Sequence, residues 1–329
     1  MRYSIIIPVY NRPDEVDELL NSLKHQIYKD FEVIIVEDGS SISCESVVQQ
    51  YTDSLDIQYF YKPNSGPALS RNYGAERSRG EYLIILDSDC VVPEAYFEEI
   101  EKELNRAPSD AFGGPDRADE SFTEIQKAIN YSMTSFITTG GIRGGKKKLD
   151  KFYPRSFNMG VRKIFFEALN GFSDMRFGED IDFSIRIMDG GYSCRLFPEA
   201  WVYHKRRTDL KKFFKQVYNS GTARISLYRK YPKTLKLVHT LPAIFTVGLV
   251  FLLITSFFYL YALIPVVLLL VLILIDSFIR TKNFKIALLA VPTSLVQLTG
   301  YGSGFLSACW NILIRKKEKY TAFEKNFYK

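Results

Sequence analysis

The chain has 329 residues, of which 47% are hydrophobic and 24% charged, so it can bury a large core and is not a disordered, collagen-like or coiled-coil protein. Its 43 Lys and Arg against 37 Asp and Glu give a net charge of +6, too small to indicate nucleic-acid binding. Its four cysteines lie far apart and form no Cys-x-x-Cys pair, which excludes a disulfide scaffold and is typical of a reducing compartment.

The first 230 residues alternate strand-like and helix-like patterns. Short apolar runs predict strands at 4–10, 31–38, 57–61 and 81–87, and amphipathic stretches predict helices at 15–26, 46–51 and 67–77. This alternation predicts an α/β domain with a parallel sheet, helical crossovers and a ligand site at the carboxyl ends of the strands. The apolar run before Pro8 is too short for a signal peptide, so we expect this domain to stay in the cytoplasm.

Carboxylates close the predicted strands. Asp38 ends the second strand, and Asp87 and Asp89 end the fourth. Each alone has an ordinary explanation as the N-cap of the next helix. Alternate residues of an extended chain project to the same side, so Asp87 and Asp89 are expected to share one Mg²⁺ or Mn²⁺ ion. Such an ion would neutralise a diphosphate and so turn a nucleotide into a leaving group.

A second acidic group begins a predicted helix that runs to about residue 188. The helix dipole and an i,i+4 pair with Arg186 account for Asp182. They do not account for the adjacent Glu179 and Asp180, so Asp180 is the candidate base and Glu179 is its neighbour or an acceptor contact.

The C-terminal third reads as membrane helices. Residues 237–275 form a run of 39 without Asp, Glu, Lys or Arg, and residues 286–314 form another of 29. A bilayer core needs about 20 residues, so the first run is expected to cross twice, at about 238–260 and 263–280. Pro and Gly interrupt the third segment, 286–311, and its tail is basic, so we expect a re-entrant or interfacial segment in preference to a third crossing. The domains are therefore expected at 1–230 and 231–314, with a basic tail at 315–329.

Basic residues predict the orientation. Residues 205–236 contain eleven Lys or Arg and one acid, and residues 280–285 are also basic, whereas the turn between the two crossings is uncharged. The positive-inside tendency places both basic flanks in the cytoplasm. We therefore expect a multi-pass protein of the inner (plasma) membrane with a cytoplasmic catalytic domain. The same basic surface would attract anionic membrane lipids or a lipid-linked diphosphate.

The sequence resembles the family-2 glycosyltransferases, which have the GT-A fold, a Rossmann-like mixed sheet with helices on both faces. The resemblance rests on ordered motifs that together cover most of residues 4–229: IIIPVYNR (5–12), VIIVEDGS (33–40), GPALSRNYGAERSRGEYLIILDSD (66–89), NMGVRKIFFEALNGF (158–172), GEDIDFSIRI (178–187) and PEAWVYH (198–204). Glu37 and the run Ser173–Met175 depart mildly from the family pattern.

The resemblance implies roles for individual residues. Donor nucleotide contacts are implied for Pro8, Tyr10, Asp38, Arg71 and Asp87. The DxD metal site would be Asp87 and Asp89, with His204 either a third ligand or a structural histidine. Asp180 would be the catalytic base, with Glu179 beside it. Donor and acceptor would approach Asn158, Gly160 and Arg162, although Gly160 has the alternative of a close-packing glycine.

The predicted function is metal-dependent, inverting transfer of one sugar from a nucleotide-diphosphate sugar to a glycan or polyprenyl-linked oligosaccharide, in cell-surface polysaccharide or glycoconjugate synthesis. One alternative is transfer directly to polyprenyl phosphate, as in relatives of dolichol-phosphate-mannose synthase. Another is a catalytically dead membrane scaffold that only binds nucleotide, although the acidic residues argue against it. The sequence does not favour a nucleic-acid partner, and it leaves the oligomeric state open.

Overall fold

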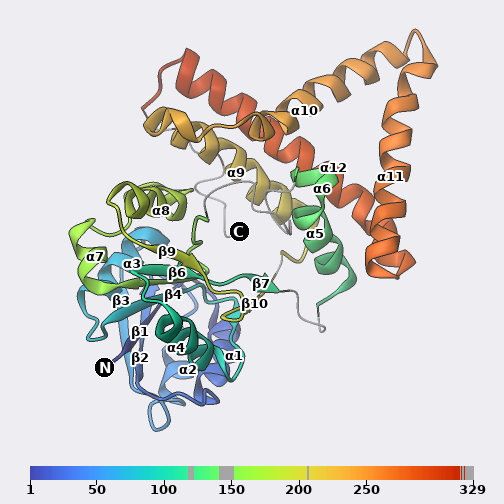
Figure 1. The fold of residues 1–329 in the computed structure, drawn as a ribbon. Coiled ribbons are helices and arrows are strands. Elements are labelled where there is room, and N and C mark those ends of the chain that lie inside the picture. Colours follow the sequence, from blue (N-terminus) through green and yellow to red (C-terminus); the bar gives the residue numbers. More distant parts are fainter. Residues whose placement is uncertain (118–121, 141–151, 206, 319, 321, 323–329) are drawn as a thin grey trace. The chain divides into compact units, whose positions relative to one another are not determined.

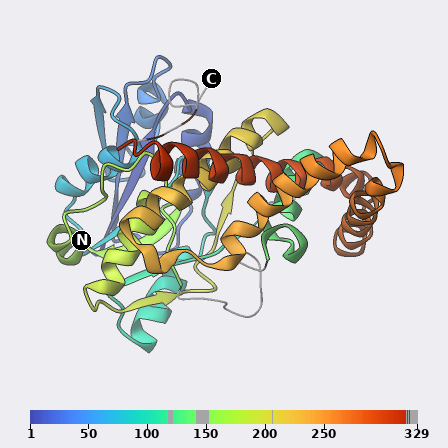
Figure 2. The same ribbon diagram turned by 90° about the horizontal axis from the view of Figure 1, so that it is seen from above.

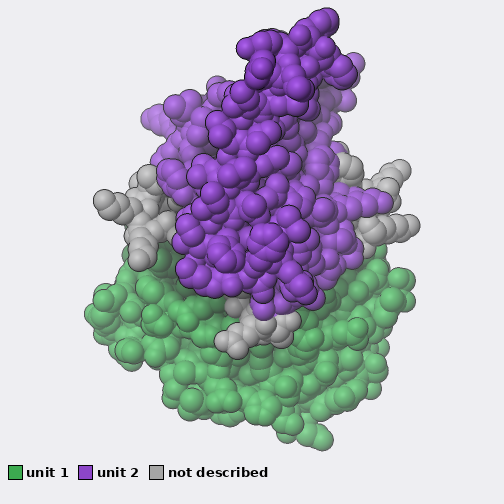
Figure 3. All heavy atoms as spheres, turned by 90° about the vertical axis from the view of Figure 1, so that its right-hand side faces the viewer, with its two compact units in different colours: residues 1–119, 151–205 green, residues 120–150, 206–329 purple. Residues whose placement is uncertain are grey.

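The computed structural model describes residues 1–117, 122–140, 152–205, 207–318, 320 and 322. The chain forms two compact units: Met1–Asp119 with Lys151–Lys205, and Glu120–Asp150 with Arg206–Lys329 (Figure 3). The predicted boundary at 230 therefore differs from this division, because residues 120–150 and 206–230 group with the C-terminal helices.

The first unit is built on a seven-stranded sheet with the order β3-β2-β1-β4-β8-β6-β9 (Figure 1). Its strands are β1 (Tyr3–Val9), β2 (Phe31–Asp38), β3 (Ile57–Lys62), β4 (Tyr82–Leu86), β6 (Ala111–Gly113), β8 (Asn158–Arg162) and β9 (Cys194–Leu196). The four strands predicted from the sequence are parallel to one another. Strand β8 is antiparallel to both β4 and β6, so the sheet is mixed.

Helices cover both faces of this sheet, because alternate strand residues point to opposite sides. One core joins Ile5 and Ile7 of β1 to α1 (Pro13–Lys24), α2 (Glu45–Gln49) and α4 (Tyr96–Arg106). The other joins Ile6 to α3 (Pro67–Glu76), α7 (Lys163–Ala168) and α8 (Glu179–Asp189). A small sheet of β5 (Cys90–Val91), β10 (Val202–His204) and β7 (Asp116–Arg117) completes the unit.

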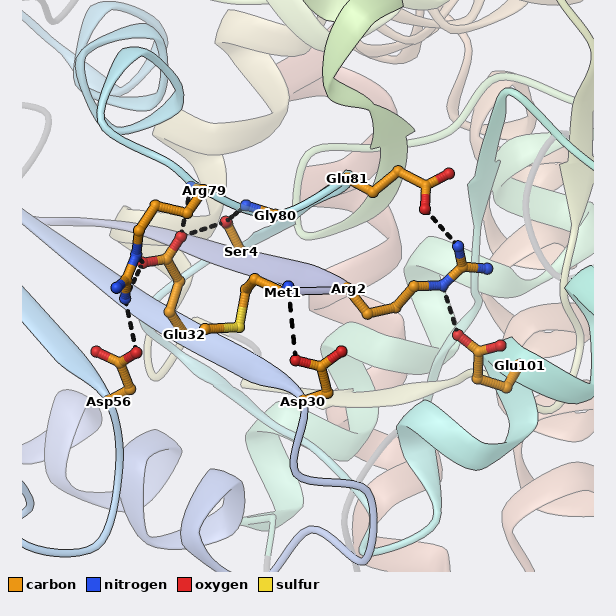
Figure 4. A network of polar contacts seen from close by, with 10 residues as sticks. All are labelled: Met1, Arg2, Ser4, Asp30, Glu32, Asp56, Arg79, Gly80, Glu81 and Glu101. Carbon is orange, nitrogen blue, oxygen red and sulfur yellow. Dashed lines mark hydrogen bonds and ion pairs between the residues drawn. The ribbon is translucent and has the colours of Figure 1, made fainter.

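A polar network ties together the amino ends of the parallel strands (Figure 4). Glu32 is fully buried, accepts from Ser4 at 2.6 Å and pairs with Arg79 at 2.7 Å. A second group joins Arg2 to Glu81 and Glu101. This network satisfies the buried carboxylate and lies at the edge opposite the carboxyl ends of β1, β2 and β4.

The second unit is helical. It contains α5 (Glu124–Thr134), α6 (Phe136–Thr139), α9 (Leu210–Lys230), α10 (Leu237–Ser256), α11 (Ile264–Thr281) and α12 (Phe284–Ala308), with short 3₁₀ turns at Pro232–Thr234 and Leu260–Leu263 and a π-turn at Cys309–Ile314 (Figures 1 and 2). Three segments are long and apolar enough to cross a membrane: Leu237–Ser256, Leu260–Thr281 and Phe284–Ile314.

The third of these segments differs from the other two. In its most apolar stretch 39% of the residues are buried, against 11% in each of the other two segments. Helix α12 continues without a break through Pro292, whereas a re-entrant path needs a turn. The glycines pack helices closely: a Cβ at Gly304 would lie 2.0 Å from the Tyr218 carbonyl oxygen, and one at Gly302 would lie 2.3 Å from that of Pro242.

Candidate active site

A buried arginine links three elements at the carboxyl edge of the sheet. Arg71 of α3 donates to Asp87 Oδ1 after β4 at 2.7 Å and to Glu179 Oε1 at the start of α8 at 2.9 Å. Its side chain is only 3% exposed, whereas that of Asp87 is 31% exposed. The guanidinium therefore fixes a carboxylate that still faces solvent.

Asp38, at the end of β2, is held by the next crossover. Its carboxylate accepts from the backbone N–H groups of Ser65 and Gly66, both at 2.8 Å, and pairs with Lys62. Gly66 has φ of +93°, a conformation that glycine adopts without steric cost. The turn before α3 is thus shaped around Asp38.

Asp89 lies in a group of possible metal ligands. Its Oδ1 is 3.2 Å from His204 Nε2, and its Oδ2 accepts from Arg12 at 3.0 Å. One ligand atom each from Asp89, Cys90 and His204 lies within 4.8 Å of the other two. Cys90 pairs with His204 across the β5–β10 ladder, which explains why the two come together.

This donor set fits a divalent cation. Carboxylate oxygen and imidazole nitrogen bind Mn²⁺, while the Cys90 thiol is a softer donor. Among the described residues, His204 Nδ1 is buried and has no hydrogen-bond partner. Asp87 does not belong to this group of ligand atoms, so the expected sharing of one ion by Asp87 and Asp89 remains a prediction.

Asp180, the predicted base, is paired with an arginine that sequence reasoning missed. Arg155 Nε donates to Asp180 Oδ2 at 2.5 Å, and the Ile181 N–H donates to Oδ1 at 2.8 Å. Burial alone would raise the pKa of Asp180, but the charge and hydrogen bond of Arg155, with the Ile181 N–H, hold that pKa below its usual range. Asp180 is therefore ionised at neutral pH.

The adjacent Glu179 behaves oppositely. Burial and the negative charge of Asp180 raise the pKa of Glu179, and Arg71 only partly offsets this effect. Two neighbouring carboxylates with divergent pKa values are typical of sites that handle protons. The expected pair of Asp182 and Arg186 is present at 3.0 Å and is structural, since Asp182 also accepts from Ser173.

The remaining predicted residues are divided between the two edges. Pro8 lies in β1 and Tyr10 just after it, at the carboxyl edge. Asn158 stands opposite Leu86 at that edge, but it is buried, donates to the Ala200 carbonyl and accepts from Tyr96.

Gly160 and Arg162 are not brought to the carboxyl edge. A Cβ at Gly160 would lie 2.1 Å from the Phe112 ring, which agrees with a close-packing glycine. Arg162 stands opposite Tyr82 at the amino end of β4, beside Glu81. It lies four residues along the strand from Asn158, roughly 13 Å away. The structure therefore does not bring Gly160 and Arg162 together with the predicted site residues at the carboxyl edge, and their acceptor role stays a prediction.

Sequence reasoning missed Arg12, Lys62, Cys90 and Arg155. Arg12 lies inside the motif at 5–12, and Cys90 directly follows the motif at 66–89, so their positions in the sequence could have indicated a place at the site. Lys62 and Arg155 reach their partners only through the fold, over 24 and 25 residues of sequence.

Residues 4–169 match the Glycosyl transferase family 2. The chain belongs to this family. A glycosyltransferase of Haemophilus influenzae, not further characterised, is 32% identical over 56% of this chain and 61% of its own length. Glycosyltransferase AglE of Haloferax volcanii is 25% identical over 68% of this chain and 73% of its own. Relatives from Rickettsia are matched over less than a quarter of their own length in three cases.

Solved structures show the same fold. The mannosyltransferase PcManGT of Pyrobaculum calidifontis, in complex with GDP-Man and Mn²⁺, has a TM-score of 0.61 over 96% of this chain and 88% of its own chain. The two share 16% sequence identity, so the likeness concerns the fold. The expected GT-A architecture followed by a helical region is confirmed.

Proposed function

We propose that this family-2 glycosyltransferase is membrane-anchored and moves one sugar from a nucleotide-diphosphate sugar to a hydroxyl of a glycan or lipid-linked oligosaccharide, with inversion. One observation carries the proposal: the Arg71 guanidinium links the strand-end carboxylate Asp87 to the start of the helix that bears Asp180. Donor-binding and proton-accepting groups are thereby held on one rigid edge of the sheet, as transfer between two bound sugars requires.

The donor nucleotide would lie against Pro8, Tyr10 and Asp38, with Arg71 and Asp87 near the diphosphate. Asp87, Asp89 and His204 would hold Mg²⁺ or Mn²⁺, which neutralises charge on a diphosphate leaving group. The Asp89–His204 distance of 3.2 Å and the Mn²⁺ present with PcManGT support this assignment.

Asp180 would accept the proton of the acceptor hydroxyl. A single displacement needs a base on the side opposite the leaving group, and an ionised, buried carboxylate supplies one. Arg155 occupies Asp180 Oδ2 in this structure, so an acceptor hydroxyl would have to share or replace that contact. Glu179, with its raised pKa, would hold the acceptor or a proton beside it.

The protein would sit in the inner (plasma) membrane with its first unit in the cytoplasm. The apolar helices α10 and α11 and the basic residues at 229–236 and 280–285 support this orientation. Anionic lipids and the lipid-linked acceptor would meet the basic flank.

The test uses the full chain in detergent with a panel of nucleotide sugars and glycan acceptors. We expect metal-dependent transfer with an inverted anomer, and a loss of about 10²- to 10⁴-fold in turnover for Asp180→Asn, with donor affinity unchanged. Asp189→Asn, at the exposed end of the same helix, is the matched control.

Two outcomes would contradict the proposal. A chloroform-soluble sugar monophosphate as the sole product would indicate direct transfer to polyprenyl phosphate. Binding of nucleotide sugars without turnover for any acceptor would indicate the scaffold alternative.

A further inference from the structure

We propose that α12 does not cross the membrane: it lies in the plane of the membrane surface beside α9 and α5, and only α10 and α11 span. Residues 315–318 would then lie on the same side of the membrane as α9. The inference concerns topology and is independent of the sugar, metal and acceptor.

Helices α9 and α12 run side by side in the same direction (Figures 1 and 2). Phe213 clusters with Val296 at one end, and Ile225 with Phe305 and Ile312 further along. Between them, Thr222 Oγ1 donates to the Gly304 carbonyl at 3.4 Å. The contact is too close for larger residues.

A Cβ at Gly300 would lie 2.6 Å from Val217 Cγ2, and one at Gly221 would lie 2.2 Å from the Tyr301 carbonyl oxygen. Helix α12 therefore cannot tilt away into the bilayer without losing the packing that its glycines allow.

Helix α9 cannot follow α12 into hydrocarbon. Six of its 21 residues are Lys or Arg, three near its start and three near its end: Lys211, Lys212, Lys215, Arg224, Arg229 and Lys230. Lys215 and Arg224 lie within about 8 Å of the middle of the helix, well inside a hydrocarbon core about 30 Å thick. A basic residue costs about 2.5–3.5 kcal/mol at the centre of a membrane helix. If α12 spanned the membrane, the basic residues of α9 would have to enter the hydrocarbon with it, because the two helices are packed along their lengths.

The first half of α12 also has a polar neighbour. Thr293 Oγ1 donates to the Ala128 carbonyl of α5 at 3.2 Å, and Lys285 at the start of α12 pairs with Glu124 of α5 at 3.8 Å. Helices with charged residues thus accompany α12 from residue 285 to residue 312.

The end of α12 is tied back to α9. Arg229 donates to the carbonyl oxygens of Lys317 and Glu318, at 3.0 and 3.2 Å. Arg229 belongs to the basic stretch before the first crossing, which the positive-inside tendency places in the cytoplasm. Residues 317 and 318 must share its side, whereas a spanning α12 would leave them on the other.

Helix α12 has an apolar stripe suited to the membrane surface. Phe284, Leu288, Leu306 and Trp310 are 38–63% exposed. Leu288 and Leu306 are five helical turns apart and so lie on one face, with Phe284 and Trp310 a turn beyond them. Gly302, which contacts α10 at Pro242, lies on the same face. The apolar stripe and the spanning helix α10 thus share one side, as expected of an interfacial helix.

The test measures the sidedness of the full chain in a bacterial inner membrane. One cysteine is added, in place of Tyr259 at the turn between α10 and α11 or of Lys316, to a chain carrying Cys194→Ser and Cys309→Ser. The buried Cys44 and Cys90 are kept, and the same chain without an added cysteine gives the background labelling. A membrane-impermeant maleimide is added to intact or permeabilised cells. We expect Tyr259→Cys to react in intact cells and Lys316→Cys to react at least tenfold more after permeabilisation.

Labelling of Lys316→Cys in intact cells would overturn the proposal. A second measurement avoids substitutions: green fluorescent protein or alkaline phosphatase is fused after Lys329. Fluorescence without phosphatase activity is expected, and the reverse would refute an in-plane α12. Neither readout depends on sugar transfer, so failure here is distinct from failure of the proposed function.

Discussion

Arg155→Gln tests whether the arginine sets the protonation of the proposed base. Arg155 Nε contacts Asp180 Oδ2 at 2.5 Å, and its charge is the main cause that holds the pKa of this buried carboxylate down. The glutamine side chain would keep a hydrogen-bond donor but lose the charge. Burial, which favours the neutral acid, would then dominate.

The size of the effect follows from the geometry. An opposite charge within about 4–6 Å lowers a carboxyl pKa by about 1–3 units, and each unit corresponds to about 1.36 kcal/mol. Removing that charge should raise the pKa of Asp180. A base must be ionised to act, so the acid limb of kcat/KM against pH should move to higher pH, with the loss of activity confined to low pH.

The assay is sugar transfer by the full chain between about pH 4.5 and 9, with Arg106→Gln as control. Arg106 pairs with Glu103 on the surface of α4, so its loss should leave the profile unchanged. An unmoved acid limb in Arg155→Gln, with a measurable rate, would refute Asp180 as the base or Arg155 as its partner. A uniform loss at all pH values would instead indicate acceptor binding by Arg155.

Two further predictions use single substitutions. Asp89→Ala should abolish transfer, as should a chelator, because Asp89 supplies a carboxylate to the proposed metal site. The melting temperature of this variant in detergent should stay near that of the parent. Full activity with chelator would contradict this prediction. Gly304→Ala should destabilise the second unit by about 1–3 kcal/mol, because its methyl group would meet the Tyr218 carbonyl. Gly248→Ala is the control, because a Cβ at this position meets nothing within 4 Å. Equal melting temperatures of the two variants would contradict the close packing of α9 on α12.

Most of the sheet could be predicted because its strands have clear local sequence patterns. The apolar runs that give β1, β2, β3 and β4 are short, buried and bounded by polar residues, and their observed bounds differ from the predicted ones by one residue at most. The motif that contains β8 is visible in the sequence, but the antiparallel direction of this strand is not, because its pairing with β4 joins residues about 80 positions apart.

The site residues that directly follow a strand could be predicted from the sequence. Those that reach the site only through the tertiary structure could not. Asp38, Asp87 and Asp89 stand at strand ends, so their convergence followed from topology. Arg155 reaches Asp180 from a segment with no helix or strand of its own, and the sequence carries no local sign of that contact. Arg162 shows the opposite case, because the motif that contains it runs along β8 from the carboxyl edge of the sheet to the amino end of β4.

The boundary between catalytic and membrane parts illustrates why hydropathy alone does not define domains. Helix α9 is too basic to resemble a membrane segment, yet its apolar side packs on α12, as does that of α5. Average polarity does not show which side of a helix is buried, whereas packing depends on that side alone. Cutting the chain at residue 230 would leave Phe213, Val217 and Ile225 without their partners on α12, although every predicted active-site residue would remain. Such exposed apolar faces lead to aggregation. The chain therefore does not divide into stable parts at the point where the sequence becomes hydrophobic.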